Sequence, residues 1–195
     1  SRQINVLQKA TAGFKRIEAL FRTDTRIGEG RENLPAGQAL GVEFDRVTFS
    51  YFQGDPVLRD VNFRLEPGRV LGLLGRTGSG KTTLTRLLFR FYDVDSGEIR
   101  MGGQDLRQVR LQGLRQKVGM VTQDVQIFKA SLRENLSLFD ERIDDERLLK
   151  AIEELGLDPW FRSLPEGLDS TVSSGALSAG EAQLLAFARV FLKDP

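Results

Sequence analysis

The sequence predicts an α/β fold organised around one glycine-rich loop, and three neighbouring segments predict it. Residues 70–74 are continuously apolar, which is typical of a short buried strand. Residues 75–82 follow with the spacing G-x-x-x-x-G-K-T, the pattern of a phosphate-binding loop. Leucines then recur at helical spacing behind the loop. Strand, loop and helix in this order are the context that the loop motif requires.

The residue types in this loop suit a bound phosphate group. Its glycines let the backbone turn tightly, so that successive N–H groups point into one concavity. The helix predicted to begin near Lys81 directs the positive end of its dipole there. Lys81 adds a point charge for the β- and γ-phosphate oxygens, and the Thr82 hydroxyl is placed to ligate Mg²⁺. A glycine-rich turn with a surface lysine is the alternative, but the flanking segments favour the phosphate-binding interpretation.

Composition restricts the classes of function. The chain has 195 residues, 40% of them hydrophobic and 28% charged, which suits one soluble domain or one and a half. A net charge of +1 gives no electrostatic case for a nucleic-acid partner. Cys and His are both absent, which excludes disulfides, thiolate metal sites and histidine bases. No apolar run reaches the length of a membrane span, and the N-terminus does not resemble a signal peptide. Any membrane anchor is therefore expected in another segment or chain.

The N-terminal half is expected to form a helix, a linker and an antiparallel sheet. Apolar residues at helical spacing over 4–21 predict a helix that packs on its own domain or belongs to a preceding one. Residues 23–41 are polar and glycine-rich, as in a linker. Residues 42–51 and 61–65 alternate like two strands, with a phase slip near Arg46 that indicates a bulge. A further short strand between two turns is expected over 93–103.

The C-terminal half is expected to contain one buried strand and several helices. Residues 118–122 are apolar and predict that strand, which ends at Gln123. Helical patterns begin at Ser131, at 144–145 and at 177–181, and residues 157–175 are expected to be a loop. The apolar face of the second helix is expected to be Leu148, Leu149, Ile152 and Leu155. Residues 136–141 resemble a strand ending in Asp-Glu, but their position and length favour a loop.

Three further candidates lie outside the glycine-rich loop. Tyr51 ends a strand and could stack on a purine, or could be an ordinary half-buried tyrosine. Gln123 follows an apolar strand, where its amide could ligate Mg²⁺ or hold a water, or could be a loop residue. Ser178 and Gly180 open a helix whose free N–H groups form a second anion site. Ser178 and Glu181 also fit a capping box, and both interpretations can hold.

Together these residues resemble the nucleotide-binding domain of an ATP-binding cassette (ABC) transporter of the exporter type. Tyr51 matches the aromatic A-loop, residues 75–83 match Walker A, Gln123 matches the Q-loop and residues 177–181 match the signature motif. The match covers 42–195, and residues 1–22 resemble the tail of a transmembrane-domain helix. The resemblance implies a P-loop NTPase with a RecA-like core, an antiparallel β subdomain and a helical subdomain at about 125–190, truncated at its C-terminus.

The resemblance also implies ligands and partners. ATP and Mg²⁺ would be the cofactors, and a second nucleotide-binding domain, packed head to tail, and a transmembrane domain would be the partners, with no nucleic acid. Lys81 and Gln123 would be catalytic, and Thr82 and Gln123 would ligate the metal. The nucleotide would contact Tyr51, Arg76, Thr77, Gly78, Ser79, Gly80, Lys81, Thr82 and Thr83, and, from the partner, Ser178, Ala179, Gly180 and Glu181. The parent protein would lie at the cytoplasmic face of the cell membrane, and this fragment would be soluble.

The sequence departs from the family pattern in two ways. The family's Walker B carboxylates and switch histidine would come after Pro195, so the chain alone is expected not to turn over ATP. Ala179 and Glu181 replace the usual glycine and glutamine of the signature, and residues 172–177 are shorter than usual and lack a glutamate. The alternatives are a soluble ABC ATPase without transport, a non-catalytic nucleotide-binding partner and, more remotely, a small-molecule kinase.

Overall fold

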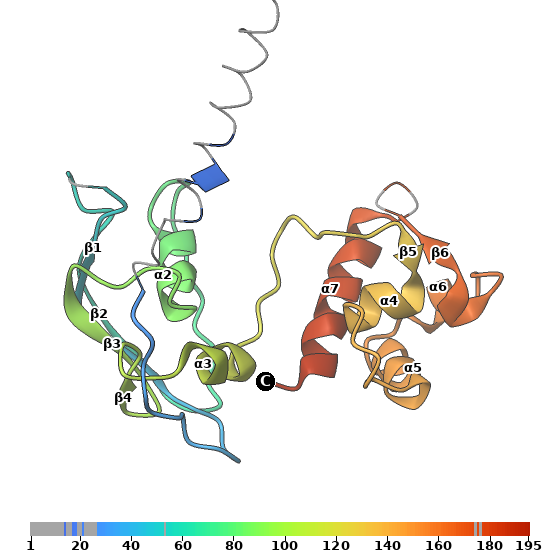
Figure 1. Ribbon diagram of the computed structural model, residues 1–195, viewed down its shortest axis with the longest axis horizontal. Helices are drawn as coiled ribbons and strands as arrows, with labels where there is room; N and C mark the ends of the chain where they lie inside the picture. Colours follow the sequence, from blue (N-terminus) through green and yellow to red (C-terminus); the bar gives the residue numbers. More distant parts are fainter. Residues whose placement is uncertain are drawn as a thin grey trace, which may run out of the picture. The chain divides into compact units, whose positions relative to one another are not determined.

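A computed structural model describes residues 14, 17, 18, 21, 27–52, 54–173, 175 and 177–195. The chain divides into two compact units, Ser1–Leu111 (unit 1) and Gln112–Pro195 (unit 2), whose elements are labelled in Figure 1. The four described positions between 14 and 21 are helical, and three of them are exposed phenylalanine or isoleucine side chains. Most of the helix predicted over 4–21 lies outside the described residues.

Unit 1 is built on a four-stranded antiparallel sheet in the order β2-β1-β3-β4 (Figure 1). The strands are β1 (Val42–Phe49), β2 (Leu58–Leu65), β3 (Ser96–Met101) and β4 (Gln104–Asp105). The antiparallel portion predicted from alternation is therefore confirmed, including the short strand between two turns. Phe44 stacks on Phe63 across the β1–β2 pair, with 4.5 Å between ring centroids.

The predicted phase slip in β1 is confirmed as a bulge. Val42 and Phe44 are buried before it and Val47 and Phe49 after it, so the inward face changes parity between them. The β1–β3 register shifts between Asp45 and Thr48, and Arg46 has a φ of 50°. A bulge of this kind lets one strand keep apolar residues on the core side despite an extra residue.

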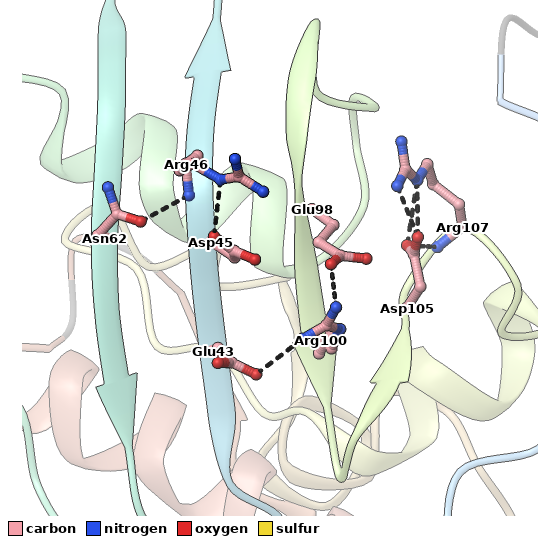
Figure 2. A network of polar contacts seen from close by, with 8 residues as sticks. All are labelled: Glu43, Asp45, Arg46, Asn62, Glu98, Arg100, Asp105 and Arg107. Atoms are coloured by element: carbon pink, nitrogen blue, oxygen red, sulfur yellow. Dashed lines mark hydrogen bonds and ion pairs between the residues drawn. The ribbon is translucent and has the colours of Figure 1, made fainter.

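Oppositely charged side chains pair along this sheet, and one of the pairs joins two strands (Figure 2). Glu43 lies between cross-strand partners on β2 and β3, and its carboxylate pairs with Arg100 at 3.3 Å. Arg100 also pairs with Glu98 on its own strand. The Arg107 guanidinium contacts Asp105 at 2.6 Å beyond β4. These groups are partly exposed, so each pair contributes little to stability.

Residues 27–41, expected to be a linker, pack on unit 1 over part of their length. Glu32 bridges Val109 in a parallel sense, and its backbone N–H donates to the Gln108 carbonyl at 2.9 Å. Leu34 is buried. At Gly30 a Cβ atom would lie 2.2 Å from the Val109 carbonyl oxygen, so only glycine allows this close approach.

The buried strand predicted at 70–74 is wrong. These residues have no regular secondary structure, and the side chains of Val70 and Leu74 are 97% and 98% exposed. A strand requires a hydrogen-bonded neighbour. In the described part of the chain no backbone hydrogen bond joins residues 70–74 to another segment. The helix after the loop does form, as α2 (Lys81–Leu88), and it buries Leu87.

Unit 2 is mostly helical. Its elements are α4 (Leu132–Ser137), α5 (Asp145–Glu154), α6 (Asp158–Phe161), a 3-10 turn η1 (Gly167–Asp169) and α7 (Ala179–Lys193), together with the short strands β5 (Ala130–Ser131) and β6 (Thr171–Val172). Helix α3 (Leu111–Lys117) begins at the unit boundary. The helix starts predicted at Ser131, at Asp144 and at residues 177–181 are confirmed, each with a side-chain cap.

The core of unit 2 gathers leucines of α4, α5 and α7 around Leu132, Leu148 and Leu185. Leu149, predicted on the buried face of α5, is instead 43% exposed, and the buried positions of this helix are Leu148, Ala151 and Ile152. The region 157–175, predicted as a loop, contains α6, η1 and β6 between its turns. Residues 136–141 end α4 and then turn, so they are not a strand.

The buried strand predicted at 118–122 is also wrong. The segment has no regular secondary structure, and Met120 is 42% exposed. Lys193 donates from Nζ to the carbonyl oxygen of Val118 in this segment and to that of Arg115 in α3. Apolar residues in sequence are compatible with a strand, but here, too, the described residues supply no neighbouring strand to complete a ladder.

One buried polar side chain connects α4 to the segment before it. Asn135 is fully buried, accepts a hydrogen bond at Oδ1 from the Phe128 N–H and donates from Nδ2 to the Phe128 carbonyl, each at 2.9 Å. Arg189 of α7 donates from Nε to the Asn135 carbonyl and from Nη1 to the Gln126 carbonyl, each at 2.8 Å. Helix α7 and residues 126–135 are therefore fixed to each other.

Candidate functional site

The glycine-rich loop of unit 1 closes around the ammonium group of Lys81. Nζ donates to the carbonyl oxygens of Gly75 at 2.8 Å and Arg76 at 2.9 Å, and lies 3.4 Å from Ser79 Oγ. An ammonium group has three N–H donors. Two are used well by the loop carbonyls, and the third has only the long contact to Ser79. One donor of Lys81 is thus available to an incoming phosphate oxygen.

Two glycines determine the shape of this loop. Gly80 caps α2 with a φ of 89°, and a Cβ there would meet Leu58 Cδ2 at 2.7 Å. Gly78 also has a positive φ, of 83°, with open space beside it. Backbone in this region of φ is readily available only to glycine. The spacing of the motif therefore corresponds to real conformational requirements at these positions.

Thr82 and Thr83 follow Lys81 on the first turn of α2 and have different surroundings. The Thr82 side chain is exposed, whereas Thr83 is buried. A hydroxyl beside a phosphate-binding loop is a hard oxygen ligand of the kind that Mg²⁺ prefers. The residues present therefore fit a magnesium ion bound jointly by Thr82 and phosphate oxygens. Among the described residues no cluster of three acidic side chains could hold a metal by itself.

Tyr51 lies in the same unit, just beyond the end of β1. Its ring contacts Phe49 edge-on at 5.0 Å between centroids and Tyr92 at 5.1 Å. Its hydroxyl lies 3.1 Å from Thr83 Oγ1 and accepts a hydrogen bond from Arg86 Nη1 at 3.1 Å. The candidate aromatic residue is thus linked directly to α2, the helix that follows the glycine-rich loop.

Gln123 and residues 178–181 belong to unit 2. Gln123 is exposed and lies in a bend, next to Thr122, whose hydroxyl donates to the Asp124 carbonyl at 2.8 Å. The predicted capping box is present: Glu181 N–H donates to Ser178 Oγ at 3.2 Å, and Ser178 N–H donates to Glu181 Oε2 at 2.7 Å. Residues 174 and 176, part of the segment noted as short, lie outside the described residues.

The N-terminus of α7 keeps some capacity for an anion. The capping box uses the N–H groups of Ser178 and Glu181, and the N–H of Ala182 bonds back to the Ser178 carbonyl. A Cβ at Gly180 would meet nothing within 4 Å, so its backbone is open to a ligand. The hydrogen bonds from the backbone and side chain of Ser178 lower the pKa of Glu181, which keeps it ionised. This negative charge beside the helix terminus opposes an incoming phosphate.

The structure brings some of the predicted residues together. Tyr51, Lys81, Thr82 and Thr83 share unit 1 with the loop, whereas Gln123 and the capping box share unit 2. Sequence reasoning missed Arg86, which bonds to Tyr51. A signal for it existed, because Arg86 lies three residues after Thr83 and so shares a helix face with it.

No helix within the described ranges is both long enough and apolar enough to cross a membrane.

Comparisons with known proteins agree on one family. The family model described as "ABC transporter" matches residues 58–195. Among curated proteins, the chain is 39% identical over 161 residues to a probable multidrug resistance ABC transporter ATP-binding/permease protein of Bacillus subtilis, covering 81% of this chain and 24% of that protein. It is also 39% identical over 192 residues to an ATP-dependent lipid A-core flippase of Alkalilimnicola ehrlichii, covering 96% of the chain and 32% of the flippase.

A solved structure of a bacterial Atm1-family ABC exporter with ATP bound matches with a TM-score of 0.85 and 28% identity, covering 98% of this chain and 34% of the exporter chain. The chain thus spans about a quarter to a third of the length of these relatives. Their names describe ATP-binding/permease proteins, a flippase and an exporter, so they do not favour the alternative of a soluble ABC ATPase without transport.

Proposed function

The chain belongs to the ABC transporter family, and on that premise we propose that it is the ATP-binding part of an exporter, which couples ATP binding and hydrolysis to transport across a membrane. The observation that carries the proposal is the position of Lys81. Its ammonium is held by two carbonyls of a glycine-rich loop, with a third donor available to a phosphate oxygen. Such a charge stabilises the β/γ-phosphates in phosphoryl transfer.

The proposed nucleotide site begins with the loop and Tyr51 of unit 1. Residues 76–83 would bind the phosphates, the Tyr51 ring would stack on the adenine, and Thr82 would ligate Mg²⁺. Gln123 would approach the metal or the attacking water when the site is assembled. When bound, Mg²⁺ would neutralise charge on the β/γ oxygens, while this chain's residues bind and orient the nucleotide.

The proposed second half of the site comes from a partner domain packed head to tail. Its α7 N-terminus, with Ser178, Ala179, Gly180 and Glu181, would cover the γ-phosphate. The open backbone at Gly180 supports this role, whereas the Glu181 carboxylate weakens it. ATP that fits the closed pair better than the open one would drive closure, and a transmembrane domain would convert closure into movement of a substrate.

For the 195 residues by themselves we propose nucleotide binding without turnover. Within the described residues no carboxylate hydrogen-bonds to the loop, so no general base is placed beside it. Positioning and charge stabilisation account for nearly all of phosphoryl-transfer catalysis. A chain lacking one of these groups is expected to lose several orders of magnitude in rate.

The test compares Lys81→Met with Lys150→Met in the full-length protein. Lys150 is exposed on α5, far along the sequence from the loop, and serves as a matched control for loss of one lysine charge. Lys81→Met should reduce ATPase activity at least about 100-fold, as removal of one transition-state contact typically does, while Lys150→Met keeps it. Equal ATPase activity in the two variants would contradict the proposal.

A further inference from the structure

We infer that Arg86 is a positioning residue for the nucleobase: it holds the Tyr51 ring in the orientation in which the ring stacks on adenine. This inference rests on the proposed function and adds a residue to its site. Arg86 lies one turn beyond the glycine-rich loop, on the exposed side of α2. It is not part of the loop motif.

The direction of the hydrogen bonds at Tyr51 follows from the groups involved. Arg86 Nη1 lies 3.1 Å from the Tyr51 hydroxyl oxygen, and a guanidinium can only donate. The phenol therefore accepts from Arg86. Its own proton is then free to go to Thr83 Oγ1, which lies 3.1 Å away. In this chain of hydrogen bonds Arg86 donates to Tyr51 and Tyr51 donates to Thr83. The hydroxyl proton of Thr83 then remains available for another acceptor.

Two more contacts fix the plane of the ring. Phe49, which is 2% exposed, meets it at an interplanar angle of 83°, and Tyr92 meets it at 86°. The guanidinium carbon of Arg86 lies 5.8 Å from the ring centroid, within the range of a cation–π contact. These edge contacts limit rotation of the ring about its long axis. The hydroxyl oxygen lies on that axis, so the hydrogen bond from Arg86 fixes where the far end of the ring lies.

Arg86 and Thr83 are three residues apart on α2, so they present their polar groups on one side of the helix. Lys81 begins the same helix. The hydrogen bonds to Thr83 and Arg86 thus fix the Tyr51 hydroxyl relative to α2, the helix that begins with Lys81. The distance between the stacking ring and the phosphate loop is then set by one short rigid element, which is what recognition of a base joined to a triphosphate requires. Hydrogen bonding to Tyr51 also raises the pKa of Arg86, so the donor stays charged.

The experiment uses the full-length protein with Arg86→Met and, as a matched control, Arg64→Met. Arg64 lies on β2, is 68% exposed and pairs with Glu66 at 2.7 Å. Calorimetry would measure the dissociation constants of ATP and of inorganic tripolyphosphate, which lacks the base. Arg86→Met should weaken ATP about two- to tenfold, the size expected for one net hydrogen bond, and leave tripolyphosphate unchanged. Arg64→Met should change neither.

A second readout separates positioning from simple attraction of charge. Tyr51→Phe keeps the ring but removes the hydroxyl, so its effect should not add to that of Arg86→Met, because both remove the same link. Additive effects, or equal weakening of ATP and tripolyphosphate, would overturn the inference while leaving the proposed function intact. So would an unchanged ATP affinity in Arg86→Met. Failure of the wild-type protein to bind ATP would overturn both.

Discussion

Replacing Asn135 with alanine is expected to destabilise unit 2 strongly. The side chain is fully buried on α4 and joins that helix to the segment preceding β5. Its amide exchanges two hydrogen bonds of 2.9 Å with the backbone of Phe128 and donates a third, of 3.1 Å, to the Ser131 carbonyl. Alanine removes all three and leaves the backbone groups to find water or remain unpaired.

The size of the effect can be worked out from these bonds. Each intramolecular hydrogen bond contributes about 1 kcal/mol net, and an unpaired buried group adds a further penalty of about 1–3 kcal/mol. Three bonds give about 3 kcal/mol, and one backbone group left unpaired raises the loss to about 4–6 kcal/mol. This is a large part of the about 5–15 kcal/mol that stabilises a typical domain. Asn135→Asp keeps the acceptor for the Phe128 N–H but places an oxygen against the Phe128 carbonyl, so it should also destabilise.

Urea denaturation would measure the change, with fluorescence of Trp160 as the probe. Trp160 is the only tryptophan of this chain and packs partly buried against the core of unit 2. The midpoint should fall by about 1 M urea or more for Asn135→Ala. Gln183→Ala, at an exposed position of α7, is the control and should stay within about 0.5 kcal/mol. An Asn135→Ala variant as stable as this control would refute the reasoning.

Three further substitutions test other features. Gly97→Ala should lower the free energy of unfolding by at least about 2 kcal/mol in thermal denaturation. The reason is that a Cβ would lie 2.3 Å from a carbonyl oxygen of the β1 bulge, at a φ of 79°. A loss below about 0.5 kcal/mol would contradict this. Glu181→Gln keeps the oxygen that accepts from Ser178 but removes the charge, so ATP-dependent pairing of two domains should tighten severalfold in sedimentation assays; weaker pairing would count against a phosphate at α7. Side-chain hydrogen bonds from Arg142 are the main cause that lowers the pKa of Asp140 to about 2. The stability that this ion pair adds to the folded state is therefore complete above the ordinary pKa of 3.8, and it is lost as the pH falls towards 2. NMR titration should show this midpoint, and Arg142→Ala should raise it towards 3.8; an unchanged midpoint would show that the pair is not formed.

Features set by neighbouring residues could be predicted from the sequence. The capping boxes at Ser131 and Ser178 depend on a residue three positions away, and both are present. The bulge near Arg46 was visible because the apolar residues of one strand change parity. Gly80 likewise follows from the local demand for a positive φ at the start of α2. In each case the physical cause and the sequence signal lie within a few residues.

Features that depend on distant partners could not be predicted. Residues 70–74 and 118–122 have the composition of buried strands, but a strand is stabilised by its ladder of hydrogen bonds, and composition does not show whether a neighbour is present. The bond between Arg86 and Tyr51 spans 35 positions and joins a helix to a strand end. The burial of Asn135 similarly depends on α7, more than forty residues further along the chain.

The uncovered apolar segment before the glycine-rich loop has a consequence for handling this polypeptide. Val70 and Leu74 present almost their whole side chains to solvent, next to backbone amides without partners among the described residues. Such a stretch presents exposed apolar surface and unpaired backbone groups to a second molecule, and this combination promotes aggregation. The solubility of the 195-residue polypeptide is therefore expected to depend in part on residues 70–74, and nucleotide binding that rearranges the adjoining glycine-rich loop should alter it.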